Sequence, residues 1–362
     1  MSLKALWKPL SIKGGNESLS RSSHGLVSIR NGEQVLIFGG ELKPRTPVNG
    51  DLLYLNHLDI ASPEISTLSP SSDDDDNSKE WPASRVGASL VSTDQGKVYL
   101  WGGRGGKEMG TFTQEKGIWE FDPSLKRWKE LETKGDNPEP RSFHTMCQVD
   151  NKLYLHAGCP ASGRLGQLHS LDLENFTWFR LPDAPEPGRG GTVLTRLPPT
   201  LSNKTLLARF GGFAGYELDG LDVYDVEKRE WKSIEVEGEI KPEKRSVHVF
   251  VGLDGKLEFE GKIVVGVLAL GEREGAPAEL GHNGAGFFHN DAWALLASKD
   301  SEPRPRFTWT KLETSLESRG IPEPRGWLPA AHLSGSKVVF QGGLNEKNER
   351  LSDAWTLEVV VE

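Results

Sequence analysis

The amino-acid sequence predicts an all-β fold, a six-bladed β-propeller, and three observations carry this prediction. A short apolar run that ends on a glycine pair recurs along the chain, an arginine precedes each run, and a short aromatic or aliphatic segment follows it. Units of roughly 40–50 residues built from four short strands are typical of propeller blades. No stretch with helical periodicity competes with this interpretation.

Length and composition agree with such an architecture. The chain has 362 residues, of which 36% are hydrophobic and 26% charged, so it can both dissolve and bury a core. The 41 glycines and 22 prolines are spread evenly, as expected of many short strands joined by tight turns. A net charge of −9 argues against a surface for nucleic acid or for an anionic membrane.

The sequence predicts neither a secretory leader nor a membrane span. The first residues contain no apolar stretch long enough for a leader, and no run of about 18 apolar residues occurs anywhere. The two cysteines, Cys147 and Cys159, favour a reducing compartment over a disulfide scaffold. We therefore expect a cytoplasmic protein.

The glycine-pair motif occurs six times. Four copies are regular, and two, which we call worn, keep only one glycine of the pair. These are VLIFGG (35–40), VYLWGG (98–103), LARFGG (207–212) and VVFQGG (338–343), with LYLHAGC (153–159) and VGVLALGE (265–272) as the worn copies. Glycine tolerates a positive φ and lets the chain turn tightly beside a neighbouring blade. The glycine pairs are therefore expected to be structural.

An arginine precedes every copy, usually in an R-S-x-H or P-x-R context. The six repeat arginines are Arg21, Arg85, Arg141, Arg189, Arg245 and Arg325. We expect these arginines, and the histidines of the R-S-x-H segments, to tie one blade to the next.

These repeats resemble those of the kelch superfamily, and the resemblance covers essentially the whole chain. The blades are expected at about 17–70, 82–133, 138–182, 186–235, 242–313 and 322–362. The last unit lacks its fourth strand, and ALWKPL near the N-terminus can supply it. We therefore expect residues 5–12 to complete the sixth blade and close the ring, which leaves no free sheet edge there.

The strand order of a blade determines which of its connections meet. If the first strand runs up and the second runs down, the loop between the second and third strands lies on the face where the first strand begins. The segments after the glycine pairs and those around the repeat arginines should therefore converge on one mouth of the central channel. Loops held by a rigid scaffold are common places for binding residues.

Three of these six loops contain side chains that could bind a ligand or a metal. Those of the second and third blades place Arg104 and Arg164 soon after the glycine turn, where two guanidinium groups would hold a sulfate, phosphate or carboxylate. Each arginine could instead form a surface ion pair. The fifth blade carries a cluster of carboxylates and imidazoles within twenty residues: Glu272, Glu274, Glu279, His282, His289 and Asp291. Carboxylate plus imidazole is a ligand set suited to Fe(II) or Mn(II), although the glycines of this loop could simply fold it back on itself.

The GGR segment of the second blade, the arginine after the third glycine turn and GHNGAGFFHNDAWAL in the fifth blade resemble the plant specifier proteins. The resemblance implies an Fe(II)-dependent activity on unstable sulfated aglycones, with paired arginines for the sulfate at Arg104 and Arg164. It also implies an E-x3-D-x3-H iron motif. Read from Glu279, this chain has Asn283 and Phe287 instead of the Asp and His, so either another ligand set forms or the iron chemistry is absent.

We therefore expect a small-molecule-binding propeller, a lyase or isomerase that acts on an anionic or sulfur-containing metabolite at the channel mouth. Arg104 and Arg164 would orient the anion. Glu279 and His282 would bind a metal, with Asp291 as a third candidate ligand, or act as base and acid. The expected aromatic lining consists of Phe143, Phe213, Tyr216, Phe288 and Trp327.

A scaffold that grips a protein partner without catalysis is the alternative, since one fold serves many functions. Its best support is the acidic run SSDDDDNSKE at 71–80, which could equally be a solvated loop.

Overall fold

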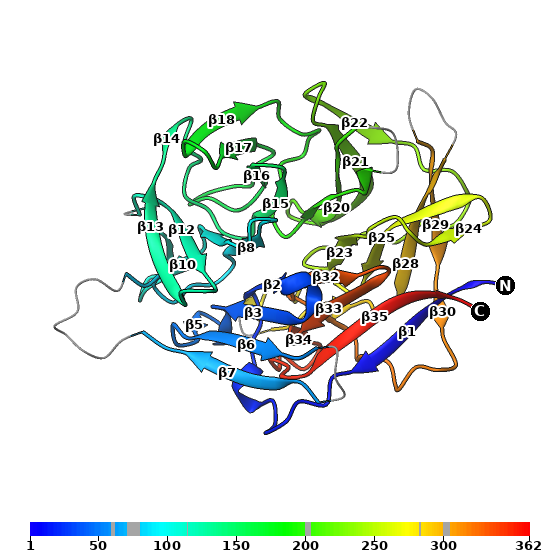
Figure 1. Ribbon diagram of the computed structural model, residues 1–362, viewed down its shortest axis with the longest axis horizontal. Helices are drawn as coiled ribbons and strands as arrows, with labels where there is room; N and C mark the ends of the chain where they lie inside the picture. The colour runs from blue at the N-terminus through cyan, green and yellow to red at the C-terminus, as the bar shows by residue number, and fades with distance from the viewer. Residues whose placement is uncertain (59–61, 71–79, 114, 200–203, 282–283, 300–304) are drawn as a thin grey trace.

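The protein is a ring of six antiparallel sheets around a central axis (Figure 1), which confirms the predicted fold class. The computed structural model describes residues 1–58, 62–70, 80–113, 115–199, 204–281, 284–299 and 305–362. Within these ranges, helix is limited to two 3-10 turns, η1 (Glu17–Leu19) and η2 (Arg30–Gly32), and to single residues.

Each blade contains four strands that run in sequence from the channel to the rim. The first blade has β2 (Gly25–Ile29), β3 (Gln34–Phe38), β6 (Leu52–Asn56) and β7 (Glu64–Leu68), and the second has β8 (Ser89–Ser92), β9 (Val98–Trp101), β12 (Gly117–Asp122) and β13 (Arg127–Glu132). The third has β15 (Thr145–Val149), β16 (Lys152–His156), β17 (Leu168–Asp172) and β18 (Thr177–Leu181). The fourth has β19 (Val193–Arg196), β20 (Leu206–Phe213), β21 (Glu217–Asp225) and β22 (Glu230–Ile234). The fifth has β23 (Val249–Gly252), β25 (Lys262–Ala269), β28 (Ala292–Ser298) and β29 (Phe307–Lys311).

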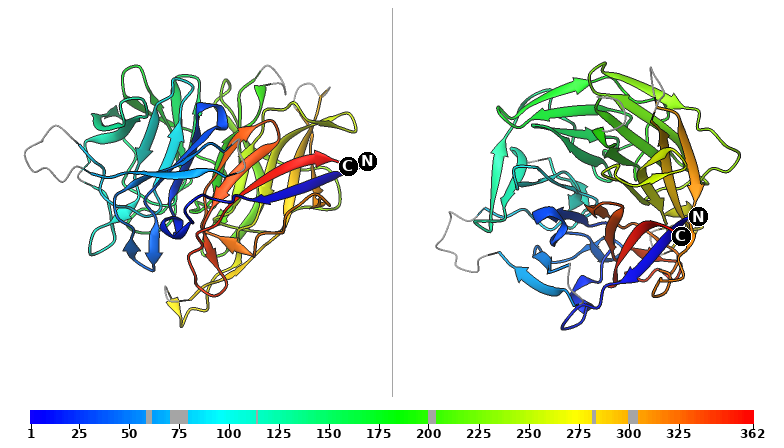
Figure 2. Two further views of the ribbon diagram at one scale, coloured as in Figure 1. Left: turned by 60° about the horizontal axis from the view of Figure 1, so that its bottom comes forward. Right: turned by 45° about the vertical axis from the view of Figure 1, so that its right-hand side comes forward.

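The sixth blade combines the two ends of the chain. It has β32 (Ala330–Ser334), β33 (Lys337–Gln341), β35 (Ala354–Val361) and β1 (Leu3–Pro9). The outermost strand β1 pairs with β35 over seven residues, from Leu3 opposite Val361 to Pro9 opposite Trp355. The chain ends lie side by side in every view (Figure 2). The prediction that an N-terminal strand closes the ring is confirmed.

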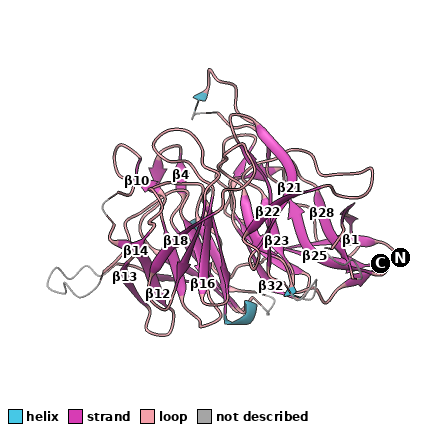
Figure 3. Cartoon of the chain, turned by 90° about the horizontal axis from the view of Figure 1, so that it is seen from above, coloured by secondary structure: helices cyan, strands magenta, loops and turns pink. Residues whose placement is uncertain are grey.

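Short additional strands extend the blades or fold their loops. β14 (Lys134–Gly135) pairs with β18, β24 (Glu258–Phe259) with β25, and β30 (Glu313–Thr314) with β1. The loops contain the pairs β4 (Glu41–Lys43) with β5 (Thr46–Pro47), β10 (Arg104–Gly105) with β11 (Gly110–Thr111), β26 (Glu272–Glu274) with β27 (Phe287–Phe288), and β31 (Arg325–Gly326) with β34 (Leu344–Asn345). In Figure 3, β4 and β10 lie on the upper side of the ring, which we call the loop face.

The core lies between adjacent blades because each sheet is apolar on both faces. Tryptophans of the outer strands make many of these contacts. Trp128 of the second blade packs on Phe38 of the first at 5.6 Å between ring centroids, and Trp309 of the fifth packs on Phe210 of the fourth at 5.5 Å. Burial of such large rings supplies most of the favourable free energy of blade packing.

The repeat arginines join the blades through backbone groups. In all six blades the arginine Nη1 donates to the carbonyl of the first residue of the glycine turn, at 3.0–3.2 Å. The N–H of the second turn residue then donates to the arginine carbonyl of the next blade, at 2.8–2.9 Å. The predicted structural role of these arginines is therefore confirmed.

The R-S-x-H histidines also lie between blades. His144 packs edge-on against Trp101 of the preceding blade at 5.0 Å, and His248 packs on Phe210 at 5.9 Å. Burial lowers the pKa of both imidazoles, to about 3 for His144, so they remain neutral and behave as apolar rings.

Candidate functional site

A closed circuit of six backbone hydrogen bonds surrounds the channel on the loop face. In each blade, the residue two places after the repeat arginine donates its N–H to the corresponding carbonyl of the preceding blade, at 2.7–2.9 Å. The six residues are Ser23, Gly87, Phe143, Gly191, Val247 and Trp327, and all have φ between 45° and 66°. We call this set the collar. Because the left-handed backbone recurs in every blade, it belongs to the fold and not to one site.

Two aromatic side chains of the collar meet across the axis. Phe143 belongs to the third blade and Trp327 to the sixth, so the two residues face each other in a ring of six. Their rings pack edge to face at 5.3 Å. A β-carbon at Gly87 would lie 2.9 Å from the Phe143 ring, so only glycine leaves room there. The rings of Phe143 and Trp327, which we call the aromatic floor, thus lie at one end of a central channel. This channel has a volume of about 1080 Å³ and is lined by the first strands of the blades.

Around the collar lie six equivalent side chains, one from each glycine turn. Each turn residue pairs with the residue that follows a repeat arginine, so the segments expected to converge on one mouth do lie together. From the first blade to the sixth, these turn positions hold Glu41, Arg104, Cys159, Phe213, Glu272 and Leu344. The repeat therefore fixes the backbone at the mouth and leaves its side chains free to vary.

Two arginines give one side of the mouth a positive charge. Arg104 donates from Nε to Ser142 Oγ at 2.8 Å, and its guanidinium lies 5.6 Å from the Phe143 ring centroid. Arg164 lies 5.6 Å from the Phe213 ring centroid. Burial lowers the pKa of Arg104, and the nearby charge of Arg164 contributes to the same shift. Neither guanidinium forms an ion pair within the described residues, so the surface-ion-pair alternative is not what the structure shows.

Two buried carboxyl groups lie in the fourth and fifth blades. The sequence pointed to Glu272 only as one of the possible metal ligands of the fifth blade, and not to Glu217. Glu272 is 6% exposed, and Trp327 Nε1 donates to its Oε2 at 2.9 Å. Glu217 is 7% exposed, pairs with Phe213 in the β20–β21 register, and has no hydrogen-bond partner for its Oε1 among the described residues. Burial raises the pKa of Glu272 to about 8, helped by Glu217, and burial also raises the pKa of Glu217. A signal for Glu272 existed in the sequence, because it stands where the second blade has Arg104.

The remaining aromatic candidates are placed differently from one another. Phe288 is buried in β27, and its ring lies beside Gly326, next to the collar. Tyr216 is 59% exposed in the turn between β20 and β21. Phe288 is therefore packed beside the collar, while Tyr216 is exposed to solvent.

The residues expected to hold a metal do not form a site in the described structure. Asp291 accepts hydrogen bonds from Arg245 at 2.7 and 3.0 Å and from Trp293 at 2.7 Å. Glu279 is exposed in the loop between β26 and β27, and His282 lies outside the described residues. In the part of the chain that the structure describes, no three His, Cys, Asp or Glu side chains are grouped so as to hold a metal ion.

The assignment of Asp291 as a metal ligand is therefore wrong, and the sixth blade shows why. Asp353 accepts hydrogen bonds from Arg325 and Trp355 in the same arrangement. A carboxylate that repeats with its arginine and its tryptophan in two blades neutralises a buried guanidinium. Asp291 already accepts three of the about four hydrogen bonds that a carboxylate can accept.

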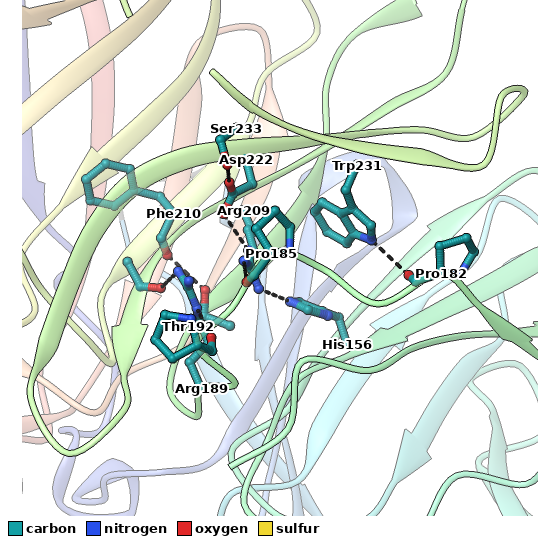
Figure 4. Close-up of polar contacts among 12 residues, drawn as sticks. His156, Pro182, Pro185, Arg189, Thr192, Arg209, Phe210, Asp222, Trp231 and Ser233 are labelled. Carbon is teal, nitrogen blue, oxygen red and sulfur yellow. Dashed lines mark hydrogen bonds and ion pairs between the residues drawn. The ribbon is translucent and has the colours of Figure 1, made fainter. Parts of the chain in front are cut away.

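A second buried polar cluster joins the third and fourth blades (Figure 4). Arg209 donates to Asp222 at 2.8 Å and to the carbonyl of Pro185, and lies 3.1 Å from His156 Nε2. Ser233 donates to the other oxygen of Asp222 at 2.6 Å. Arg209 and His156 are fully buried and their polar groups are bonded, so the cluster stabilises the interface between blades and offers no open group to a ligand.

The described residues include no helix long and apolar enough to cross a membrane.

Comparisons with known proteins agree with this geometry. The sequence model of the KLHDC2/KLHL20/DRC7 kelch-repeats domain matches residues 23–261. Over 380 residues the chain is 25% identical to N-(sulfonatooxy)prop-2-enimidothioate sulfolyase of Thlaspi arvense, covering 99% of this chain and 98% of that protein. It is 29% identical to Adagio-like protein 3 of Oryza sativa subsp. japonica over 73% of this chain, which spans only 41% of that protein. The solved structure of YjhT superposes with a TM-score of 0.65 at 14% identity, over 96% of this chain and 99% of that one. The chain belongs to the kelch-repeat family.

Proposed function

We propose that this kelch-repeat protein binds a small anionic or sulfur-containing molecule at the collar and acts on it as a lyase or isomerase. One observation carries the proposal: Arg104 and Arg164 lie at one mouth, above aromatic rings, and neither has a carboxylate partner among the described residues. Arg104 is half-buried and Arg164 is exposed. A half-buried charge is normally paired, and the second guanidinium beside it adds to the attraction for an anion, so an anion would complete the arrangement.

The geometry suits an oxyanion. Arg104 uses Nε to bond Ser142, and its Nη groups make no hydrogen bond within the described residues. These planar donors match two oxygens of a sulfate, sulfonate or carboxylate. The rings of Phe143 and Phe213 below would pack against the apolar part of the ligand.

The same two charges could assist a reaction. The relative from Thlaspi arvense is named a sulfolyase, and its name specifies a sulfonatooxy substrate. When an anion such as sulfate leaves, negative charge develops on the departing oxygens. Two preorganised guanidinium groups would stabilise that charge and so lower the barrier. The described part of the fifth-blade loop does not fit Fe(II), and no step of this proposal depends on a metal.

Substitution of Arg104 tests the proposal. The R104A variant should bind propane-1-sulfonate about 1.5–3 kcal/mol more weakly than the unaltered protein, the range for a lost hydrogen bond to a charged group. The matched control is K107A, which removes the same charge from an exposed position in the same hairpin and should change affinity little. Calorimetric titration measures both. Equal affinity of R104A and the unaltered protein would contradict the proposal.

A non-enzymatic scaffold remains the second candidate, since the fold is shared with kelch domain-containing proteins such as protein 3 of Rattus norvegicus, which is 25% identical over 76% of this chain. Its sequence support, the acidic run at 71–80, falls almost wholly outside the described residues, because 71–79 are not described. For the compartment, we propose the cytoplasm, because both cysteines are free and buried.

A further inference from the structure

We infer that the ligand of this mouth is a zwitterion, whose ammonium group is held by Glu217 and Glu272 while Arg104 and Arg164 hold its anionic end. This inference rests on the proposed anion site and adds the chemistry of the ligand's other end. It follows from how the four charges are partnered and where they lie.

The two carboxyl groups differ from the half-buried acids of the loop face because no arginine in the described structure bonds them, although Lys244 lies near Glu217. Glu41, at the equivalent turn position of the first blade, bonds Arg350 at 2.9 Å, and Asp291 bonds Arg245. Within the described residues, Glu272 has only the indole N–H of Trp327, and Glu217 Oε1 has no partner although the side chain is 7% exposed. A buried carboxyl without a partner costs free energy, so folding alone does not account for the pair.

Arg104 and Glu272 belong to opposite blades with the aromatic floor between them, whereas Arg164 and Glu217 belong to the neighbouring third and fourth blades. One line of contacts runs from Arg104 over Phe143, then to the Trp327 ring, and then to Glu272. A second runs from Arg164 over Phe213, which pairs with Glu217 in the β20–β21 register. No arginine of the described residues is among the charges that shift the pKa of Glu217 or Glu272, so the arginines do not neutralise the carboxyls.

An ammonium group fits the acidic side for three reasons. It donates three hydrogen bonds and accepts none, which matches acceptors that lack donors. It is attracted to the faces of aromatic rings such as those of the floor. Its charge would also relieve the repulsion between two adjacent carboxylates.

Binding of an ammonium group should release a proton. Glu272 faces Glu217 and Trp327, while Glu217 also faces Lys244 and Glu274. Because the pKa of Glu272 is raised to about 8, this carboxyl is mostly protonated at pH 7. A bound cation favours the carboxylate, so the proton leaves as the ligand enters.

The experiment compares probes that differ only in the amine. The full chain is titrated calorimetrically with 3-aminopropane-1-sulfonate and with propane-1-sulfonate, in two buffers of different ionisation enthalpy. We expect the amine to tighten binding at least tenfold and to release close to one proton per ligand at pH 7. E272Q and E217Q should each remove most of this preference, whereas binding of propane-1-sulfonate should not weaken. D219N, an exposed position on β21, the strand of Glu217, is the matched control and should keep the preference.

The possible failures are distinguishable. If both sulfonates bind with equal affinity, the anion site stands and the zwitterion inference is overturned. If the preference persists in both E217Q and E272Q, the amine is held elsewhere and the inference is again overturned. If neither sulfonate binds the folded protein, the proposed anion site itself fails.

Discussion

The repeat arginines and the two mouth arginines carry the same guanidinium group in different surroundings. Arg245, like the other five repeat arginines, is buried and bonded to backbone carbonyls of its own blade, and it also has a carboxylate partner. Arg104 is partly exposed and bonded only to Ser142 within the described residues. The comparison indicates that side chains which recur in every blade hold the ring together, whereas charged side chains found in only one or two blades are available to bind a ligand.

The turn positions show the same contrast for acids. Glu41 and Glu272 occupy equivalent places in the first and fifth blades, but only Glu41 has an arginine partner. The position does not determine the role of the residue. What determines it is whether a partner from a neighbouring loop reaches the side chain.

Removal of a repeat arginine should give the largest effect. R245A leaves Asp291 partly buried without its cation, and breaking a buried ion pair from one side costs about 3–5 kcal/mol. Denaturant unfolding measures this loss, and R104A, which breaks no ion pair in the described structure, should lose less than about 1 kcal/mol. Similar losses for the two variants would abolish the distinction between structural and mouth arginines.

The two turn-position glutamates should respond in opposite directions at high pH. A carboxyl whose pKa is raised by folding stabilises the folded protein below its unfolded pKa, and that contribution is lost as the pH rises to about 8. E272Q should therefore match the unaltered protein near pH 5 and exceed its stability by about 1–3 kcal/mol near pH 9. E41Q should instead be destabilised, because Arg350 loses its carboxylate. Parallel unfolding curves at the two pH values test both, and a stability difference between E272Q and the unaltered protein that is the same at both pH values would refute the contrast.

The smallest effect concerns the worn glycine turn of the third blade. Ala157 occupies the first turn position with φ 64°, where the second blade has Gly102 with φ 66°. A left-handed backbone costs a residue with a β-carbon about 1–2 kcal/mol, so A157G should stabilise the protein by about 1 kcal/mol. G102A should destabilise it by at least as much, because its β-carbon would lie 2.7 Å from the Arg141 carbonyl oxygen. A stabilising G102A would show that the turns are not equivalent.

The sequence was sufficient to predict the ring and the location of the mouth, because both follow from repetition. Strand order alone brought Arg104 and Arg164 to one face. The role of Asp291 could also have been predicted, since NDAWAL and SDAWTL align Asp291 with Asp353 before the same tryptophan. The turn position of Glu272 was a signal, but the missing cation partner and the choice of Glu217 could not be predicted, because 52 acidic residues look alike in a sequence and only the folded chain shows which ones lack a partner.

The collar also has a consequence for how the molecule opens. Each of the six collar residues donates its N–H to one neighbouring collar residue and accepts a hydrogen bond from the other. Releasing one residue therefore breaks two hydrogen bonds. Partial opening of a single blade near the axis therefore costs two hydrogen bonds instead of one. In deuterated solvent these six amide protons should exchange at one common, slow rate set by global unfolding, whereas the amides of the rim strands exchange individually and sooner.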